Sequence, residues 1–140
     1  MDTNLLLRLF FTLVIILTGI VAYIAINKIT LARAADKYRG LNGFKPGIPA
    51  ILYFTTPTCA PCKTVQRPAI QELQQTMGDS LQVIEVDASE QTDLADYWGV
   101  LSVPTTFIID SHGQPRHINH GVTRAEKLRE QLSQITSKIL

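Results

Sequence analysis

Cys59 and Cys62 are the only cysteines in the 140-residue chain, and Ala60 and Pro61 separate them. No cysteine is left for a framework of structural disulfides, which excludes a disulfide-stapled secreted scaffold. A C-x-x-C pair can instead carry out thiol–disulfide exchange or supply two ligands to a metal ion. The elements around the pair help to distinguish these two chemistries.

The pair lies where a buried strand is expected to end and a helix to begin. Residues 50–54 form a continuous apolar run, and an amphipathic helix is predicted after Pro61. Unpaired N–H groups at a helix N-terminus stabilise a thiolate, so we expect Cys59 to be the nucleophile. Cys62 comes one turn later, close enough to attack a mixed disulfide formed by Cys59. Pro61 suits an early helical position, because its missing N–H would have no partner there.

Zinc binding is the alternative chemistry. His117 and His120 form a His-x-x-His pair that would complete four ligands together with the two cysteines. The two pairs are 54 residues apart, and a strand-to-helix junction is not the tight turn of a zinc knuckle. All three histidines, including His112, otherwise fit ordinary turn and strand positions. The sequence favours redox chemistry, and no metal ligand is assigned.

The elements that must hold the pair follow one another as β-α-β-α-β-β-α. The predicted strands are residues 50–54, 81–86, 105–109 and 115–119, and the predicted helices run from 61 to 78, from 92 to 98 and from 124 to 139. The first helix is expected to bury Val65, Ala69, Leu73 and Met77, and the last helix Leu128, Leu132, Ile135 and Ile139. This order predicts a central mixed sheet with a parallel crossover first and an antiparallel hairpin last.

Two motifs resemble those of the thioredoxin superfamily. The first is Thr58-Cys59-Ala60-Pro61-Cys62-Lys63 after a strand, and the second is Val103-Pro104-Thr105 before a strand. The resemblance covers residues 48–140 and implies an α/β fold, a thioredoxin-like central mixed sheet flanked by helices. It also implies a cis peptide bond before Pro104, which faces the dithiol and presents the Val103 backbone to an extended substrate. Gly121 matches the family's glycine beside the active site.

The resemblance further implies an enzyme, a protein-disulfide reductase that works through a Cys59–Cys62 dithiol/disulfide cycle. The redox group is this dithiol, and no bound cofactor is expected. The residues expected to form the substrate groove are Ala60, Pro61, Val103, Pro104 and Gly121. The expected partners are protein disulfide substrates and an upstream electron donor, either a reductase or a membrane dithiol protein. A non-catalytic partner-binding or redox-sensing module of the same fold is the alternative.

The chain departs from typical thioredoxins around the dithiol. Thr58 stands where the family has a tryptophan, and Tyr53 where it has a buried aspartate that helps to deprotonate the second cysteine. Val83 stands in place of the lysine that partners this aspartate. Pro68 lies one residue further from the cysteines than usual, and residues 27–47 offer no clear counterpart of the family's first strand and helix. The sequence therefore predicts a site without the buried acid–base pair.

A transmembrane helix is predicted before this domain. Residues 9–26 carry no charge, and these 18 residues cover about 27 Å of helix, close to the hydrocarbon thickness of a thin bilayer. A cleaved signal peptide is the alternative, since Ala32-Arg33-Ala34 has the form of a cleavage site. The length of the apolar stretch and the basic residues after it favour an uncleaved anchor in a single-pass membrane protein.

The net charge of +1 is a sum over three regions of different character. The N-terminal segment 1–26 is neutral, the basic linker 27–45 carries +4, and the thioredoxin-like domain 46–140 carries −3. The near-zero total excludes a basic nucleic-acid-binding protein. Because the positive charge follows the apolar stretch, the positive-inside rule favours a cytoplasmic redox domain, with the exported face as the alternative.

Overall fold

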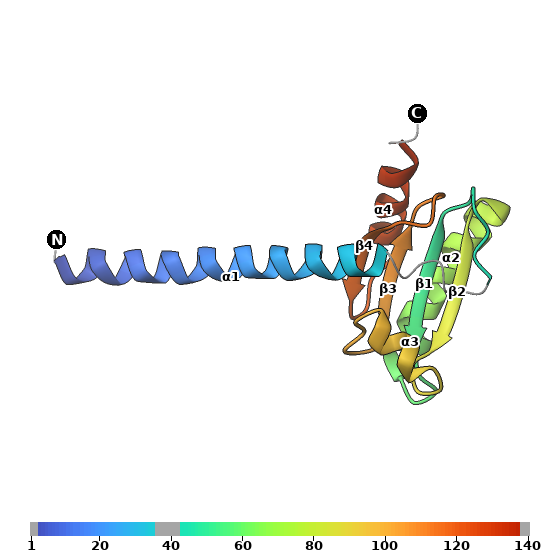
Figure 1. Cartoon of the computed structure of the whole chain (residues 1–140), viewed down its shortest axis with the longest axis horizontal. Coiled ribbons are helices and arrows are strands. Elements are labelled where there is room, and N and C mark those ends of the chain that lie inside the picture. Colours follow the sequence, from blue (N-terminus) through green and yellow to red (C-terminus); the bar gives the residue numbers. More distant parts are fainter. Residues whose placement is uncertain (1–2, 36–42, 138–140) are drawn as a thin grey trace. The chain divides into compact units, whose positions relative to one another are not determined.

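The computed structural model describes residues 3–35 and 43–137 of the chain (Figure 1). The chain divides into two compact units, residues 1–30 and residues 31–140. The first unit is helical, and the second contains a β-sheet with helices on both of its faces.

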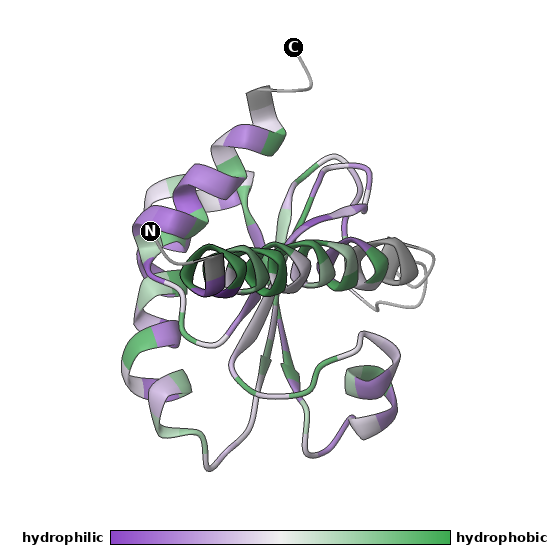
Figure 2. Ribbon diagram, turned by 90° about the vertical axis from the view of Figure 1, so that its left-hand side faces the viewer, coloured by the Kyte–Doolittle hydropathy of each residue, from purple (hydrophilic) through white to green (hydrophobic). Residues whose placement is uncertain are grey.

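Helix α1 (Thr3–Ala35) contains the apolar stretch and extends beyond it at both ends. Its segment Asn4–Thr30 is 27 residues long, is apolar enough to cross a membrane, and is not buried within the protein. Figure 2 shows hydrophobic colouring along most of α1, whereas the helices of the second unit carry both colours. A signal sequence near an N-terminus shares this length and composition, so the helix is consistent with a membrane anchor and with a signal peptide. Beyond this segment, α1 continues as far as Ala35.

Four strands form one mixed sheet in the order β2-β1-β3-β4. The strands are β1 (Ala50–Thr55), β2 (Gln82–Asp87), β3 (Thr105–Ile109) and β4 (Pro115–His120). β1 pairs with β2 in parallel, and β3 pairs antiparallel with β1 and with β4. The predicted parallel crossover and terminal hairpin are therefore confirmed. β1 is buried along its whole length, because it lies at an inner position with helices on both sides of the sheet.

Helices α2 (Arg67–Met77) and α4 (Ala125–Ser137) cover one face of the sheet, and α3 (Thr92–Tyr97) covers the other. The core cluster under α2 and α4 contains Tyr53 and both cysteines. The cluster under α3 contains Trp98 and Phe107, whose rings meet edge to face at 4.9 Å. On α4 the expected residues Leu128, Leu132 and Ile135 are buried, and Ile139 lies outside the described residues.

The helix after the cysteines includes one π-helical turn, η2 (Cys62–Gln66), before it continues as α2. The N–H of Arg67 bonds to the carbonyl of Cys62, five residues earlier. Pro68 has no N–H to donate to the carbonyl of Thr64, which weakens the regular α-helical pattern at this point. The π turn therefore carries the second cysteine at its first position.

The π turn changes which residues of this helix face the core. A π turn holds more residues than an α turn, so the face shifts by about one position. Gln66 is fully buried, whereas Val65 is 42% exposed and Ala69 is half-buried. The prediction that Val65 faces the core is therefore wrong, and the buried face continues through Ile70 and Leu73.

Asp110 organises the turn between β3 and β4. Its buried carboxylate accepts hydrogen bonds from the N–H groups of His112 and Gln114, both at 2.9 Å, and from Nε of Arg116 at 2.6 Å. Burial raises the pKa of this carboxyl group, but the hydrogen bonds and the charge of Arg116 outweigh that effect and lower the pKa below its ordinary value. The ionised form of Asp110 therefore stabilises the fold.

We expect Asp110→Asn to lower the free energy of unfolding by about 1–2 kcal/mol at neutral pH, the scale of hydrogen bonds to a charged group. The pKa of Asp110 is lower in the folded than in the unfolded state, where it is about 3.9. Its contribution is therefore fully present above the unfolded pKa and is lost as the pH falls through the folded pKa. Urea unfolding of the full chain in detergent, followed by the fluorescence of Trp98, measures the effect.

Asp79→Asn is the matched control, because Asp79 is exposed and its replacement should leave the unfolding free energy nearly unchanged. A deficit in Asp110→Asn that stays constant from neutral pH to about pH 2 would contradict the assigned role of the carboxylate.

Candidate active site

A disulfide joins Cys59 and Cys62 at the start of the helix that follows β1. Their Cα atoms are 5.3 Å apart, within the usual range for a disulfide. Cys62 is fully buried, whereas Cys59 is 9% exposed. Cys59 is therefore the sulfur that a molecule from outside can reach, and this is the accessibility that the predicted nucleophile requires.

The sulfur of Cys59 caps the first turn of the helix. The backbone N–H of Cys62 donates to Cys59 Sγ at 3.3 Å, and the N–H of Lys63 donates to the Cys59 carbonyl at 3.4 Å. The first contact satisfies one of the donors that a helix N-terminus otherwise leaves unpaired. In the reduced protein, the same N–H and the positive end of the helix dipole favour a thiolate at Cys59. The arrangement is suited to nucleophilic attack by Cys59.

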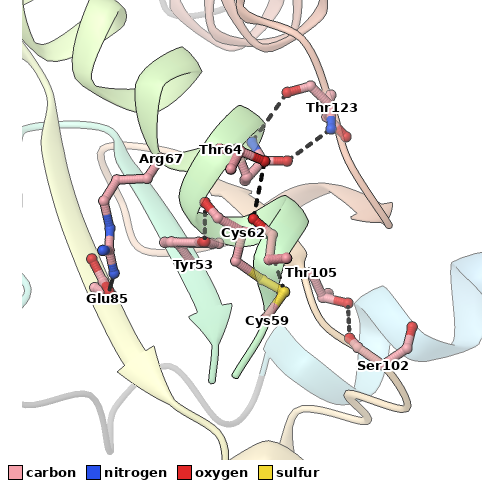
Figure 3. The surroundings of a disulfide bond; sticks show 11 residues. Tyr53, Cys59, Cys62, Thr64, Arg67, Glu85, Ser102, Thr105 and Thr123 are labelled. Atoms are coloured by element: carbon pink, nitrogen blue, oxygen red, sulfur yellow. Dashed lines mark hydrogen bonds and ion pairs between the residues drawn. A yellow bond between two sulfur atoms is a disulfide. The ribbon is translucent and has the colours of Figure 1, made fainter. Parts of the chain in front are cut away.

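Tyr53 lies beside the second cysteine, with its ring buried in the core (Figure 3). The side chain is 1% exposed, and its hydroxyl donates to the carbonyl oxygen of Cys62 at 3.2 Å. Burial raises the pKa of this phenol above its ordinary value and outweighs the lowering effects of Thr55 and Arg67, so Tyr53 is neutral at physiological pH. Val83 pairs with Ile51 and packs against the same cluster. A phenol and an aliphatic side chain thus stand where the resemblance implies a charged pair.

The loop before β3 lies near the disulfide, as Figure 3 shows by the positions of Ser102 and Thr105. The Val103–Pro104 peptide bond is cis, as the resemblance implied. Val103 packs against the cluster that contains both cysteines, and the Pro104 carbonyl accepts a hydrogen bond from the N–H of Gly121 at 2.8 Å. Gly121 has a φ of +82°, a conformation that strains residues with a side chain. Three of the predicted groove residues therefore meet at one place.

The two other predicted groove residues, Ala60 and Pro61, are exposed on the turn between the cysteines. An open groove of about 250 Å³ lies along Val103, between α3 and the loop before β3. Leu101 lines this groove and is 93% exposed. Exposed apolar surface beside a groove is suited to contact with another protein chain.

Gln66, which the sequence analysis did not single out, connects the dithiol helix to the loop before α4. It is fully buried, its Nε2 donates to the Thr123 carbonyl at 3.1 Å, and its Oε1 accepts from the Thr123 N–H at 2.7 Å. Thr123 follows Gly121 by two residues, so this pair fixes the helix of Cys62 relative to the Gly121 loop. A polar residue four positions after Cys62, in an otherwise apolar face, was the available signal in the sequence.

The residues considered for zinc do not form a common site. His117 and His120 lie on β4 opposite Ile108 and Thr105, and the two cysteines are bonded to each other. Over the described ranges 3–35 and 43–137, no group of three or more His, Cys, Asp or Glu side chains is arranged to hold a metal ion. The geometry at the cysteines is that of a disulfide site.

Comparison with known sequences identifies similar proteins. The family model described as Thioredoxin matches residues 44–134. The thioredoxin of Bacillus subtilis is 35% identical over 77 residues, which cover 55% of this chain and 72% of that protein. The chloroplastic thioredoxin Y of Oryza sativa is 32% identical over 84 residues, which cover 60% of this chain and 49% of that protein.

Solved structures share the fold at lower sequence identity. Chloroplastic thioredoxin z has a TM-score of 0.60 and 24% identity, over 65% of this chain and 80% of that one. The thioredoxin of Fasciola hepatica has a TM-score of 0.57 and 22% identity, over 64% of this chain and 83% of that one. The predicted mixed sheet flanked by helices is confirmed by these likenesses.

Proposed function

The chain belongs to the thioredoxin family, and from this premise we propose that it is a membrane-anchored protein-disulfide reductase that cycles between a Cys59–Cys62 dithiol and disulfide. The family match and the cysteine pair identify it as a thiol–disulfide oxidoreductase. The observation that supports the proposed disulfide exchange is the helix N-terminus at Cys59, where the N–H of Cys62 donates to the Cys59 sulfur. A thiolate stabilised in this way, on the cysteine that keeps some exposed surface, is the reactive species of the exchange.

In the proposed cycle, the Cys59 thiolate attacks one sulfur of a substrate disulfide. A bond forms between Cys59 and that sulfur, and the other substrate sulfur leaves as a thiolate. Cys62 then loses its proton and attacks Cys59 Sγ, which closes the Cys59–Cys62 disulfide and releases the second substrate thiolate. Two electrons pass from the dithiol to the substrate, and the substrate thiolates take up two protons. An external dithiol donor, either a reductase or a membrane dithiol protein, restores the reduced form.

The proposed substrate contacts are Ala60, Pro61, Val103, Pro104 and Gly121. Ala60 and Pro61 follow Cys59 directly, and Val103 packs against the cluster that contains both cysteines. The carbonyl of Pro104, next to Val103 in the chain, accepts a hydrogen bond from the N–H of Gly121. These positions support binding of an extended segment of a protein substrate beside its disulfide. The exposed side chain of Leu101 supports an apolar contact in the same segment.

The reductase activity is tested with insulin as the substrate and dithiothreitol as the electron donor. We expect the full chain in detergent micelles to accelerate the reduction of insulin, which is followed by the precipitation of the released chains. A rate equal to that of dithiothreitol alone would refute the proposed activity.

The proposed organisation is a membrane segment at residues 1–26, a basic linker at 27–45 and the redox domain at 46–140. The length and composition of the segment Asn4–Thr30 support the membrane span. The excess of basic residues after it supports a cytoplasmic domain by the positive-inside rule, although the exported side is the alternative outcome of the test below.

We expect the full chain to stay in the membrane fraction during an alkaline carbonate wash and to keep its first residues, as shown by the mass of the purified protein. An uncleaved apolar helix cannot leave the bilayer without exposing its side chains to water. A chain that is washed out and begins after Ala34 would contradict the anchor and indicate a signal peptide.

The side of the membrane is tested by labelling the reduced thiols of intact cells with a membrane-impermeant maleimide. If the domain is cytoplasmic, we expect Cys59 to be labelled only after the cells are lysed. Labelling in intact cells would place the domain on the exported side.

A further inference from the structure

The hydroxyl of Tyr53 contacts the peptide of the second cysteine. Within the described part of the chain, it is the side-chain group that donates to the Cys62 carbonyl, at 3.2 Å (Figure 3). The sulfur atoms themselves are not its partners, so any effect of Tyr53 on the dithiol acts through the position of the Cys62 backbone.

That backbone belongs to the π turn. The Cys62 carbonyl also accepts the N–H of Arg67, whereas a regular α-helix would pair it with the N–H of Gln66. A side chain that bonds to a helical carbonyl is a known cause of local departures from the α-helical pattern. Tyr53 therefore bonds to the peptide group at which the helix departs from regular geometry.

The surrounding strand and core side chains hold Tyr53 in place. It lies on the inner strand β1, and its ring is buried in the cluster that contains both cysteines. Its neighbour across the sheet, Glu85, forms an ion pair with Arg67, the residue that closes the π turn. The ion pair is partly exposed and contributes little, so the buried hydroxyl of Tyr53 is the stronger constraint on the turn.

We propose that Tyr53 is a positioning residue for the resolving step, since its hydroxyl holds Cys62 in the π turn and keeps the Cys62 thiol within reach of Cys59. This inference rests on the proposed reductase cycle. Tyr53 takes no proton in the step: the proton of Cys62 passes to solvent or to the departing substrate thiolate. The resolving sulfur is thereby prepositioned before it reacts, which raises its effective concentration at Cys59 Sγ.

Tyr53→Phe removes the hydroxyl and keeps the ring. We expect the resolving step to slow about fivefold, the scale of one hydrogen bond, while the first attack by Cys59 keeps its rate. We expect the rate at which the Cys59–Cys62 disulfide is opened to stay unchanged. A fivefold slower closure of this disulfide then makes the reduction potential of the pair about 20 mV more oxidising, at 29.6 mV per tenfold change for a two-electron couple.

The experiment uses the reduced full chain in detergent and the aromatic disulfide dithiobis(nitrobenzoate). Cys59 attacks this reagent and releases one coloured thiolate, and Cys62 then attacks Cys59 Sγ and releases the second. Stopped-flow absorbance therefore times the two steps separately, and equilibration with glutathione gives the reduction potential. Tyr97→Phe, which removes a phenol hydroxyl from α3, is the matched control.

A slower second release with an unchanged first release, in Tyr53→Phe and not in Tyr97→Phe, supports the positioning role. If Tyr53 has only a structural role, both thiolate releases should slow equally, and this result would overturn the positioning role. An unchanged rate of the second release would also overturn it. In either of these cases a wild-type chain that completes both releases leaves the proposed reductase cycle intact. A wild-type chain that releases only the first thiolate refutes the cycle itself.

Discussion

Cys59→Ser is expected to lower the rate of insulin reduction roughly a thousandfold or more, the scale seen when a catalytic nucleophile is removed. A serine hydroxyl does not ionise at neutral pH, and the helix N-terminus cannot turn it into an effective nucleophile toward sulfur. Cys62 is fully buried and cannot take over the attack. The assay is the turnover of insulin by the full chain with dithiothreitol as the donor.

Thr58→Ser is the matched control for this variant. It places a serine one residue before the nucleophile, at an exposed position, and leaves both cysteines in place. We expect it to retain turnover within about twofold, as surface substitutions usually do. Turnover by Cys59→Ser that approaches the wild-type rate would remove Cys59 from the mechanism.

Cys62→Ser is expected to convert the enzyme into a trap. Cys59 still attacks a substrate disulfide, because the N–H at position 62 and the helix N-terminus remain. Without the resolving thiol, the mixed disulfide persists, and about one equivalent of substrate stays bound through Cys59. Non-reducing gels and mass spectrometry of the full chain after mixing with insulin measure the complex.

The double variant Cys59→Ser, Cys62→Ser is the control, and it should form no such complex. Mixed disulfides that form at residue 62 in Cys59→Ser, but not at Cys59 in Cys62→Ser, would reverse the assigned order of attack. In cells, the same trap distinguishes a reductase of many proteins, which gives many complexes, from a module with one partner.

The sheet was largely predictable from the sequence because its strands carry strong local signals. β1 is a continuous apolar run, and β3 has the same bounds in the structure as in the prediction, 105–109. The extent of α1 was not predicted, because the apolar run ends at residue 26 while no glycine or proline stops the helix before Ala35. Hydropathy marks where a helix is apolar, whereas its end depends on capping and breaking residues.

The catalytic motif was predictable for a similar reason. The two cysteines and Pro104 lie in short motifs that can be recognised from residues adjacent in the chain. The contacts that fix the site depend on residues far apart in the chain, such as Gln66 and Thr123, which are separated by 57 positions. The π turn contains a contact from Tyr53 to a carbonyl nine residues later, and a periodicity count that assumes regular α turns placed Val65 on the wrong face.

The central claim is that the Cys59–Cys62 pair passes two electrons to a substrate disulfide and becomes a disulfide itself. The direct measurement mixes the fully reduced full chain with insulin in the absence of dithiothreitol, blocks free thiols at successive times, and determines the state of every cysteine by mass spectrometry. We expect that one Cys59–Cys62 disulfide, the bond seen in the structure, forms for each insulin disulfide that is reduced. Insulin that stays oxidised, or insulin that is reduced while Cys59 and Cys62 remain thiols, would contradict it.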